Sequence, residues 1–308
     1  MNKRVNKIIT YITVSLCATA TAFYFSICWY FSGLVLFPYY DAQAVKSIQL
    51  RELADNVERI QMPSPVSGII DFWYIKHEEQ APCVVIYNHG WGEQRLQSDK
   101  FSPAFNDFKC AELRYDMRGH GRRVGESVGG GHLEKQELQA LHQWLIKAKG
   151  YRENQIAWFG LSWGAATVLQ AASLDSRPAF VVSDSAFQDW ESAIFERGVR
   201  QYGAWVLAFK SGVNLMLKLR AGVSFYDASP LKSAPAIKVP VLLIHSQSDT
   251  ATASQQSLNI SRQLRSPHHF QHSDWGSDHG DDILTRPKEY QQLIKNFAAK
   301  YAPSFGQK

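Results

Sequence analysis

Three side chains that lie far apart in the sequence have the types needed for acyl transfer: Ser162, Asp249 and His279. A serine hydroxyl is a weak nucleophile unless a base such as histidine removes its proton, and that base needs an acidic side chain to hold its orientation. Each of the three follows a segment that reads as a buried strand. Since the carboxyl ends of parallel strands meet at one edge of a sheet, we expect Ser162 as the nucleophile, His279 as the base and Asp249 as the acid of one site.

The serine lies in the motif Gly160-Leu161-Ser162-Trp163-Gly164, between an apolar run at 155–159 that reads as a strand and an alanine-rich run at 165–172 that reads as a helix. A turn of this kind is tight and leaves no room for side chains at its flanks, so glycine stands at both ends. The turn should push the Ser162 hydroxyl out beyond the sheet. The N–H of Trp163 then lies at the N-terminus of the helix, where it can bind a developing oxyanion.

A second oxyanion donor is expected in the loop Asn88-His89-Gly90-Trp91-Gly92, which follows an apolar strand at 83–87. Enzymes with a serine turn of this kind build the second half of an oxyanion hole in a glycine-bearing loop at this place. We assign the role to the N–H of Trp91, with Gly92 as the neighbouring alternative. An ordinary strand-to-helix turn would have the same sequence pattern.

Other acids and histidines compete for these roles. Asp184 follows an earlier strand and could orient the base, and His272 could replace His279, although it falls within a predicted strand. His120 lies in a tight glycine-bearing loop and is expected to be structural. The stretch 268–279 holds four histidines and two aspartates, but their spacing does not place three ligands together. We therefore expect no metal, and the chemistry needs no cofactor.

Eight strand-like segments alternate with helical ones, which predicts an α/β fold with a mostly parallel central sheet flanked by helices. The predicted strands cover 57–62, 69–75, 83–87, 110–115, 155–159, 179–183, 240–245 and 268–272. The alternation breaks at about 188–226, where a long helical segment intervenes. We therefore expect one domain at 57–302 with a helical lid at about 188–226.

The lid segment is rich in aromatic and aliphatic residues, with basic residues between them. Such a segment could simply pack on the core, or it could form a surface that meets lipid or an acyl chain. On the second interpretation, Trp190, Trp205 and Phe209 are expected to line the entrance or the pocket.

Residues 1–40 are expected to be a basic stub and a transmembrane anchor. Lys3, Arg4 and Lys7 precede a run at 8–37 without a charged residue, which exceeds the roughly 20 residues that span a bilayer as a helix. Interfacial aromatic residues are expected at Trp29, Tyr30, Tyr39 and Tyr40. The basic stub should stay in the cytoplasm, so a single-pass protein would carry its domain on the far, periplasmic or extracytoplasmic, side. A cleavable signal peptide is the alternative, and 41–56 is expected to be a polar linker.

Composition limits the partners. The chain has 308 residues, 45% of them hydrophobic, and a formal net charge of +5, which fits adhesion to an anionic membrane; no nucleic-acid-binding motif accompanies it.

Cys17 and Cys28 lie in the apolar N-terminus, whereas Cys83 and Cys110 each open a predicted strand. Buried free thiols are the expected state of the last two, with a disulfide between adjacent strands as the alternative.

Together these motifs make the chain resemble the α/β-hydrolase superfamily, and in particular its membrane-anchored bacterial esterase-, thioesterase- and aminopeptidase-like serine hydrolases. The resemblance covers about 57–302 and rests on His89-Gly90-Trp91-Gly92, Asp116-Met117-Arg118-Gly119-His120-Gly121, the serine motif at 160–164, Ser229-Pro230 with 239–245, and His279-Gly280. It implies an acyl-enzyme mechanism without a cofactor. Ser246 in place of a glycine, and Thr250-Ala251-Thr252 in place of an apolar-proline step, depart from the pattern and could alter the pocket wall or tilt Asp249.

The expected activity is hydrolysis of carboxylic ester or thioester bonds, with a small-molecule acyl substrate, a lipid or an acylated protein as the partner. One alternative is a peptidase or amidase that uses the same residues, and another is a non-catalytic, membrane-tethered binding protein that keeps the fold. The sequence predicts no nucleic-acid partner and leaves the oligomeric state open.

Overall fold

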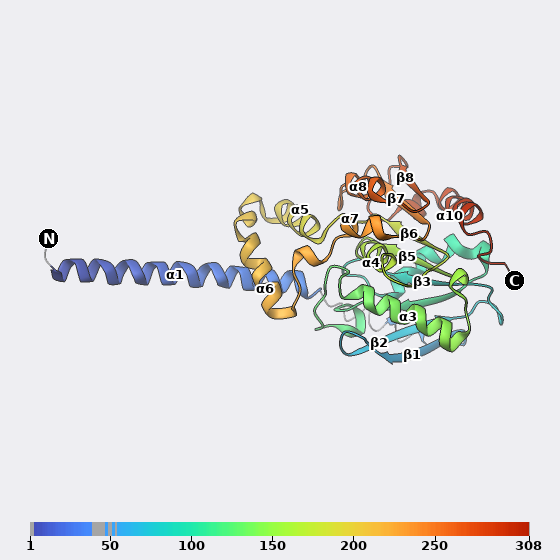
Figure 1. Cartoon of the computed structure of the whole chain (residues 1–308), viewed down its shortest axis with the longest axis horizontal. Helices are drawn as coiled ribbons and strands as arrows, with labels where there is room; N and C mark the ends of the chain where they lie inside the picture. The colour runs from blue at the N-terminus through green and yellow to red at the C-terminus, as the bar shows by residue number, and fades with distance from the viewer. Residues whose placement is uncertain (1–2, 39–46, 49–50, 53, 308) are drawn as a thin grey trace.

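An eight-stranded mixed sheet forms the centre of the domain that follows the N-terminal helix (Figure 1). The computed structural model describes residues 3–38, 47–48, 51–52 and 54–307. The strands are β1 (Val57–Pro63), β2 (Ile69–Ile75), β3 (Val84–Asn88), β4 (Ala111–Tyr115), β5 (Ile156–Leu161), β6 (Phe180–Asp184), β7 (Val241–Ser246) and β8 (His268–Ser273). Their order is β1-β2-β4-β3-β5-β6-β7-β8; the β1–β2 and β2–β4 pairs are antiparallel and the others are parallel. The predicted α/β fold is confirmed.

Helices cover both faces of this sheet. On one face lie α3 (Glu134–Lys149), α4 (Trp163–Ala172) and α8 (Gln255–Gln263), and on the other lie the 3-10 segment η1 (Arg95–Phe108) and α10 (Pro287–Tyr301). Successive residues of β3 enter opposite cores, Val84 and Ile86 on the α3 side, Val85 and Tyr87 on the η1 side. Because the central strands are buried on both faces, they read as continuous apolar runs in the sequence. Short α7 (Pro230–Ser233) and α9 (Asp282–Thr285) lie in the connections after the lid and after β8.

Cys83 and Cys110 form a disulfide, so the expectation of free thiols at these positions is wrong. The parallel pairing of β3 with β4 aligns Val84 with Ala111. The residues just before the two strands are therefore neighbours, with their Cα atoms 4.5 Å apart, which is within reach of a disulfide. The sequence places both cysteines at strand starts, but it does not show that the two strands pair in this register.

The N-terminal helix α1 (Lys3–Leu36) is the one helix in the described residues that is long and apolar enough to cross a membrane. Residues 3–23 are exposed, and this part of the helix projects away from the domain (Figure 1). Its length and composition fit either a membrane anchor or a signal sequence. Tyr39, Tyr40 and most of the predicted linker at 41–56 lie outside the described residues.

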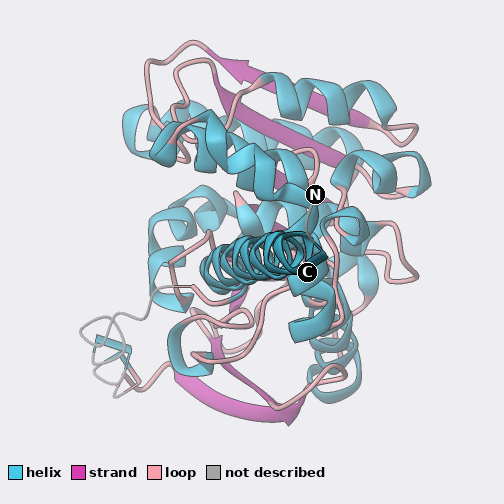
Figure 2. Cartoon of the chain, turned by 90° about the vertical axis from the view of Figure 1, so that its left-hand side faces the viewer, coloured by secondary structure: helices cyan, strands magenta, loops and turns pink. Residues whose placement is uncertain are grey.

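Between β6 and α7 the chain forms α5 (Trp190–Tyr202), the 3-10 turn η4 (Ala204–Phe209) and α6 (Lys210–Ala221), which we call the lid helices. They lie on the side of the domain from which α1 projects, and α6 packs along the C-terminal part of α1 (Figure 1). Figure 2, which looks along α1, shows this helix end-on in front of the domain. The segment predicted as a lid thus packs against the N-terminal helix as well as against the core.

Candidate active site

Ser162 stands at a sharp turn between β5 and α4. Its backbone has φ 53° and ψ −105°, and a positive φ is uncommon for a residue other than glycine. The turn is held by the Ser162 N–H, which donates to the carbonyl of Asp184 with an N···O distance of 2.8 Å. Glycine is required on both sides, because a Cβ at Gly160 or Gly164 would overlap backbone atoms, those of Asn88 in the second case. The strained turn presents Ser162 at the carboxyl edge of the sheet.

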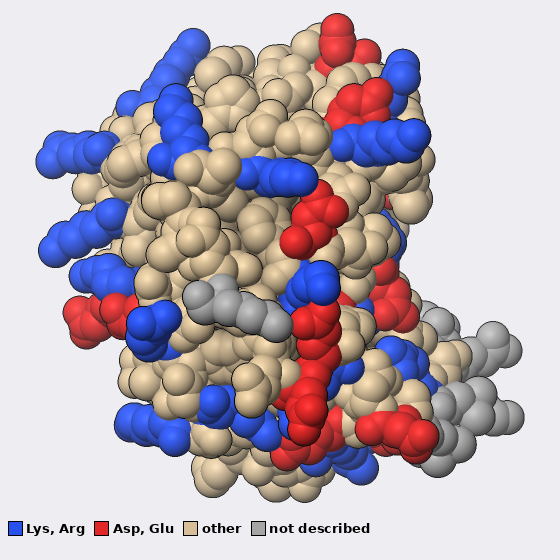
Figure 3. Space-filling view, turned by 90° about the vertical axis from the view of Figure 1, so that its right-hand side faces the viewer, with Lys and Arg blue, Asp and Glu red and all other residues tan. Residues whose placement is uncertain are grey.

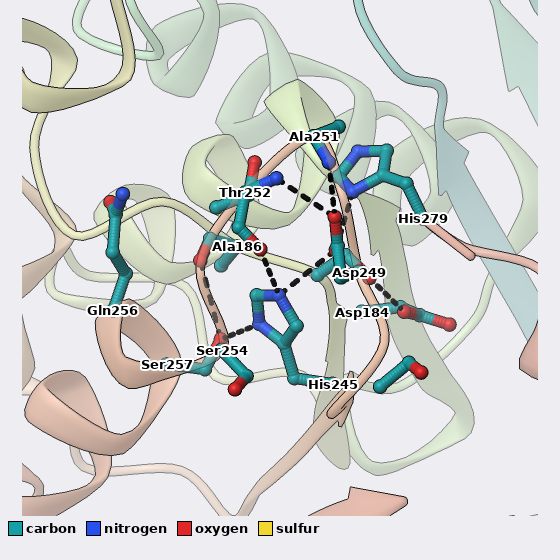
Figure 4. A network of polar contacts seen from close by, with 12 residues as sticks. Asp184, Ala186, His245, Asp249, Ala251, Thr252, Ser254, Gln256, Ser257 and His279 are labelled. Carbon is teal, nitrogen blue, oxygen red and sulfur yellow. Dashed lines mark hydrogen bonds and ion pairs between the residues drawn. The ribbon is translucent and has the colours of Figure 1, made fainter. Parts of the chain in front are cut away.

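His279 and Asp249 meet at the same edge (Figure 4). Nδ1 of His279 lies 2.6 Å from Oδ2 of Asp249. The other carboxylate oxygen, Oδ1, accepts hydrogen bonds of 2.8 Å from the N–H groups of Ala251 and Thr252, so the loop that carries the carboxylate also fixes it. With Nδ1 engaged by Asp249, Nε2 is the ring nitrogen available to a serine hydroxyl. Ser162 and His279 line one cavity.

The electrostatics of this pair follow from burial and hydrogen bonding. Burial by itself raises the pKa of Asp249, but hydrogen bonds from His245 and His279 outweigh it and hold this pKa well below its usual range. Burial by itself lowers the pKa of His279, and the hydrogen bond and negative charge of Asp249 outweigh that effect, so the pKa of His279 is raised. The pair therefore joins a stable carboxylate to an imidazole of increased basicity, as general-base catalysis requires.

A second histidine, to which the sequence pattern assigns no role, contacts Asp249. Nε2 of the wholly buried His245 lies 3.0 Å from Oδ2 of Asp249 and 3.0 Å from the carbonyl of Thr252 (Figure 4). Its Nδ1 lies 2.7 Å from Oγ of Ser257. Because both oxygens near Nε2 are acceptors, Nε2 carries the hydrogen. His245 stands at the end of a core strand, four residues before the acid, and that position is the signal that could have revealed it.

The rival acid Asp184 lies at the end of β6, where its carboxylate has other partners. It accepts hydrogen bonds from Oη of Tyr290 at 2.7 Å and from Oγ of Ser185 at 2.9 Å. Burial raises the pKa of Asp184 to about 6, against the effect of the Tyr290 hydrogen bond. Its backbone carbonyl holds the Ser162 turn, while the carboxylate that bonds to His279 is that of Asp249.

The remaining histidine candidates lie outside the cavity. Nε2 of His272, in β8, is 2.9 Å from Oγ of Ser254. In the described parts of the chain, no three His, Cys, Asp or Glu side chains are grouped as a metal site would need. His120 is buried in its loop with Nδ1 2.7 Å from the carbonyl of Arg118, and burial lowers its pKa to about 3. Its ring packs edge-on against Trp91 at 5.6 Å, so the contacts of His120 support the neighbouring loop.

The loop after β3 faces the serine turn. Trp91 and Trp163 both line the cavity, and their ring centroids are 4.8 Å apart. Trp163 is the first residue of α4, so its N–H has no acceptor within the helix. The loop is closed on itself, because the Gly90 N–H donates to Oε2 of Glu93 at 2.8 Å and the Glu93 N–H donates to the Gly90 carbonyl at 3.3 Å. The two residues predicted to bind an oxyanion therefore lie beside the serine.

The cavity has a volume of about 890 Å³ and a mostly apolar wall. The chain from the end of β6 through α6 supplies Phe187, Ala193, Ile194, Phe195, Tyr202, Val206 and Val213. The residues predicted to line it, Trp190, Trp205 and Phe209, are not among the lining residues. Trp190 is wholly buried against Trp163 and Phe225, and the other two pack on α1, where Phe31 contacts both rings.

Two comparisons with known sequences give matches. Residues 110–218 match the family model described as X-Pro dipeptidyl-peptidase (S15 family). The chain is also 27% identical over 218 residues to the uncharacterised protein YqkD of Bacillus subtilis, an alignment that covers 70% of this chain and 71% of that relative.

Three solved structures illustrate the likeness in fold. The esterase Pf2001 of Pyrococcus furiosus is 17% identical with a TM-score of 0.64, over 87% of this chain and 98% of the esterase. The 2,6-dihydroxy-pseudo-oxynicotine hydrolase is 15% identical with a TM-score of 0.67, over 98% and 86%. The acylaminoacyl peptidase of Pyrococcus horikoshii is 17% identical with a TM-score of 0.54, over 85% and 44%. The sheet order, the serine turn and these structural matches show that the chain has the α/β-hydrolase fold.

Proposed function

We propose that the chain hydrolyses carboxylic ester or thioester bonds of acyl or lipid-like substrates. The observation that carries the proposal is the apolar cavity of about 890 Å³ that Ser162 and His279 line together. A cavity of this size and lining suits an acyl chain, and a serine beside a histidine supplies the nucleophile and the base of acyl transfer.

In the first half of the proposed reaction, the Ser162 hydroxyl attacks the substrate carbonyl carbon and passes its proton to Nε2 of His279. Asp249 holds Nδ1 of the ring and stabilises the imidazolium that forms. The N–H groups of Trp91 and Trp163 bind the oxyanion of the tetrahedral intermediate. His279 then gives the proton to the leaving alkoxide or thiolate, and an acyl-serine remains.

In the second half, water replaces the serine as the nucleophile. His279 takes a proton from the water as it attacks the acyl carbon, and the same two N–H groups bind the new oxyanion. When the intermediate collapses, His279 returns the proton to the oxygen of Ser162. The products are the free carboxylic acid and the regenerated enzyme.

The charges around the cavity favour an acyl group over a substrate amine. Among the described residues that line it, Glu93 is the only carboxylate, and Arg197 and Arg200 are the only Lys or Arg side chains. Oε2 of Glu93 already accepts the Gly90 N–H at 2.8 Å, so this carboxylate is engaged by its own loop. A peptidase that recognises a free amine needs an acidic recess, and this cavity supplies little for one.

A peptidase or amidase activity of the same residues is the second candidate, and the family match of residues 110–218 favours it. An amide differs from an ester mainly in its poorer leaving group, which His279 would protonate in the same way. A third possibility, a protein that only binds at the membrane, would keep the cavity without turnover.

The deciding experiment uses the purified full chain. A fluorophosphonate probe should label Ser162, and kcat/KM for p-nitrophenyl esters should rise from acetate to octanoate, since each buried methylene adds up to ~0.8 kcal/mol, about fourfold. Ser162→Ala is the control in both assays. If the probe does not label Ser162, the non-catalytic binding protein becomes the favoured interpretation. If matched p-nitroanilides are turned over faster than the p-nitrophenyl esters, the amidase is favoured.

We also propose a single-pass membrane protein with its N-terminus in the cytoplasm and its domain on the far side. The basic residues before the apolar run support this orientation, and the Cys83–Cys110 disulfide fits an oxidising compartment. The face of the domain opposite α1 carries charges of both signs, as suits a surface in water (Figure 3). Protease added outside the inner membrane should digest the domain, whereas full protection would reverse the orientation.

A further inference from the structure

The last turns of α1 form part of the wall of the catalytic cavity. Four side chains near the end of this helix line the same cavity as Ser162 and His279: Phe31, Leu34, Val35 and Phe37. Apolar residues of the lid helices line the same cavity. The helix that is apolar enough to span a membrane therefore reaches the site where the proposed chemistry takes place.

Close packing holds α1 against the lid helices. The Arg220 guanidinium donates to the carbonyl of Trp29 at 2.8 Å and to Oγ of Ser32 at 2.7 Å, and it lies 4.1 Å over the Trp29 ring. The ring of Tyr24 stacks on Phe209 at 5.1 Å. These contacts fix the position of α1 along α6 and η4.

The end of α1 is also tied to the main domain. The carbonyl of Leu36 accepts a hydrogen bond of 3.0 Å from the N–H of Val128, and Leu36 is wholly buried. Val128 belongs to the loop between β4 and α3. The cavity wall that α1 supplies is thus joined to both the lid helices and the sheet domain. The lid helices and the sheet domain can therefore keep their position relative to each other.

The length of α1 places this wall at the surface of a bilayer. At about 1.5 Å per residue, its 34 residues extend about 50 Å, whereas the hydrocarbon core is about 30 Å thick. Trp29 and Tyr30 have the residue types that gather at the membrane interface. They lie just before Phe31, so the cavity begins where the helix leaves the hydrocarbon.

The lid helices expose apolar side chains in the segment that packs on α1. Trp205 is 53% exposed and Leu219 is 70% exposed, and both lie in the segment that packs on α1. Phe31 contacts the Trp205 ring at 5.8 Å, which links this exposed surface to the cavity wall. Exposed apolar side chains beside a membrane-spanning helix can be buried in contact with lipid and so be removed from water.

From these observations we propose that the anchor helix is part of the substrate site, and that the acyl chain of a bilayer lipid enters the cavity along α1. This inference rests on the proposed acyl-ester hydrolysis and adds the source of the substrate. Lipid leaving the outer leaflet would meet Phe31 and Leu34 first and reach Ser162 without crossing water. The scissile carbonyl would then lie at the serine turn while the chain stays in contact with α1.

The test compares two aromatic residues of α1 in the full chain, reconstituted in phosphatidylcholine nanodiscs. Phe31 lines the cavity and contacts the lid helices, whereas Tyr24 contacts Phe209 without lining the cavity. We expect Phe31→Ala to lower kcat/KM for p-nitrophenyl dodecanoate by about five- to tenfold and for the acetate by less than about twofold. Tyr24→Ala should leave the ratio of the two values unchanged.

Leu34→Ala serves as a second cavity variant, since Leu34 is 43% exposed and its truncation should cost little stability. If both cavity variants keep the wild-type ratio, or if Tyr24→Ala changes it as much, α1 only supports the lid and the inference is overturned while ester hydrolysis stands. If the wild-type chain itself shows no preference for the longer ester, the proposed acyl specificity fails first.

The route from the bilayer has its own measurement. Vesicles of dioleoylphosphatidylcholine carry 4-methylumbelliferyl oleate at varied mole fraction and constant bulk concentration. For a substrate that enters along α1, the rate should follow the mole fraction in the bilayer. A rate set by bulk concentration alone would mean entry from water and would overturn the proposed route.

Discussion

His245 and His279 share one oxygen of Asp249: Oδ2 lies 3.0 Å from Nε2 of His245 and 2.6 Å from Nδ1 of His279. Only His279 lines the cavity. His245 is wholly buried and is held on its far nitrogen by Ser257. It therefore acts on the site through Asp249, as a positioning residue for the carboxylate that orients the proposed base.

Removal of His245 should reduce the rate of the chemical step. We expect His245→Ala to lower kcat by about 10- to 100-fold with little change in KM, because a displaced Asp249 misorients His279 and the substrate does not touch His245. His245→Gln, whose amide can donate in place of Nε2, should recover part of kcat. Ser257→Ala removes the contact that holds Nδ1 of His245 and should give a smaller loss of the same kind. If His245→Gln recovers none of the lost kcat, the loss reflects local packing and not the orientation of Asp249.

The assignment of the acid can be checked by two matched substitutions. Asp249→Asn should reduce kcat by about 10⁴-fold, because the amide favours the wrong tautomer of His279. Asp184→Asn should have a mild effect on kcat, since the carboxylate of Asp184 bonds to Tyr290 and Ser185. Ser162→Ala sets the floor, at about 10⁶-fold. Steady-state kinetics on a short p-nitrophenyl ester give the ranking, and the reverse order would move the acid to Asp184.

The activity should depend on pH through His279. The ring must be neutral to accept the serine proton, and contact with Asp249 raises its pKa above the ordinary value of about 6.5. As pH falls through this raised pKa, the ring becomes charged and kcat/KM should fall. Asp249→Asn removes the negative charge, so its residual activity should show this acid limb at lower pH. If the acid limb of the pH profile lies at the same pH in wild type and variant, a group other than His279 controls that limb.

Several parts of the site follow directly from the sequence. Gly160 and Gly164 flank the serine, and the strand before them and the helix after them can be read from the neighbouring residues, so the turn is predictable. The order of strands along the chain then assigns Asp249 and His279 to the carboxyl edge. Asp184 satisfies the same rule, and the sequence does not show that its carboxylate bonds to Tyr290, which is 106 residues away.

Other features depend on packing between distant segments. The disulfide depends on the register between β3 and β4, and the cavity wall depends on how α1 packs on α6, about 190 residues later. Trp205 and Phe209 are aromatic residues in the lid, but they pack against α1 through Phe31 and are not among the residues that line the cavity. Periodicity alone does not distinguish the two sides of such a segment.

The disulfide should contribute measurable stability. It closes a loop with a sequence separation of 27 residues, for which the loss of chain entropy in the unfolded state predicts about 3–4 kcal/mol. Denaturation of the full chain in detergent with and without reductant should show this difference, with Cys83→Ser/Cys110→Ser as the matched variant. Two results together would show that the disulfide does not form: an unchanged denaturation midpoint after reduction, and alkylation of four cysteine thiols before any reductant is added.

The contact between α6 and α1 gives the last prediction. A Cβ at Gly212 would overlap the thiol of Cys28, so the two helices approach each other closely there. Gly212→Val should therefore separate α6 from α1 and open the cavity wall. We expect faster tryptic cleavage after Lys210 or Arg220 and a selective loss of activity on the dodecanoate ester, with the acetate little changed. Ser211→Val adds the same side chain at an exposed position of the same helix and should change neither. If Gly212→Val behaves like this control, α6 is not held by α1, and the wall of the cavity has another support.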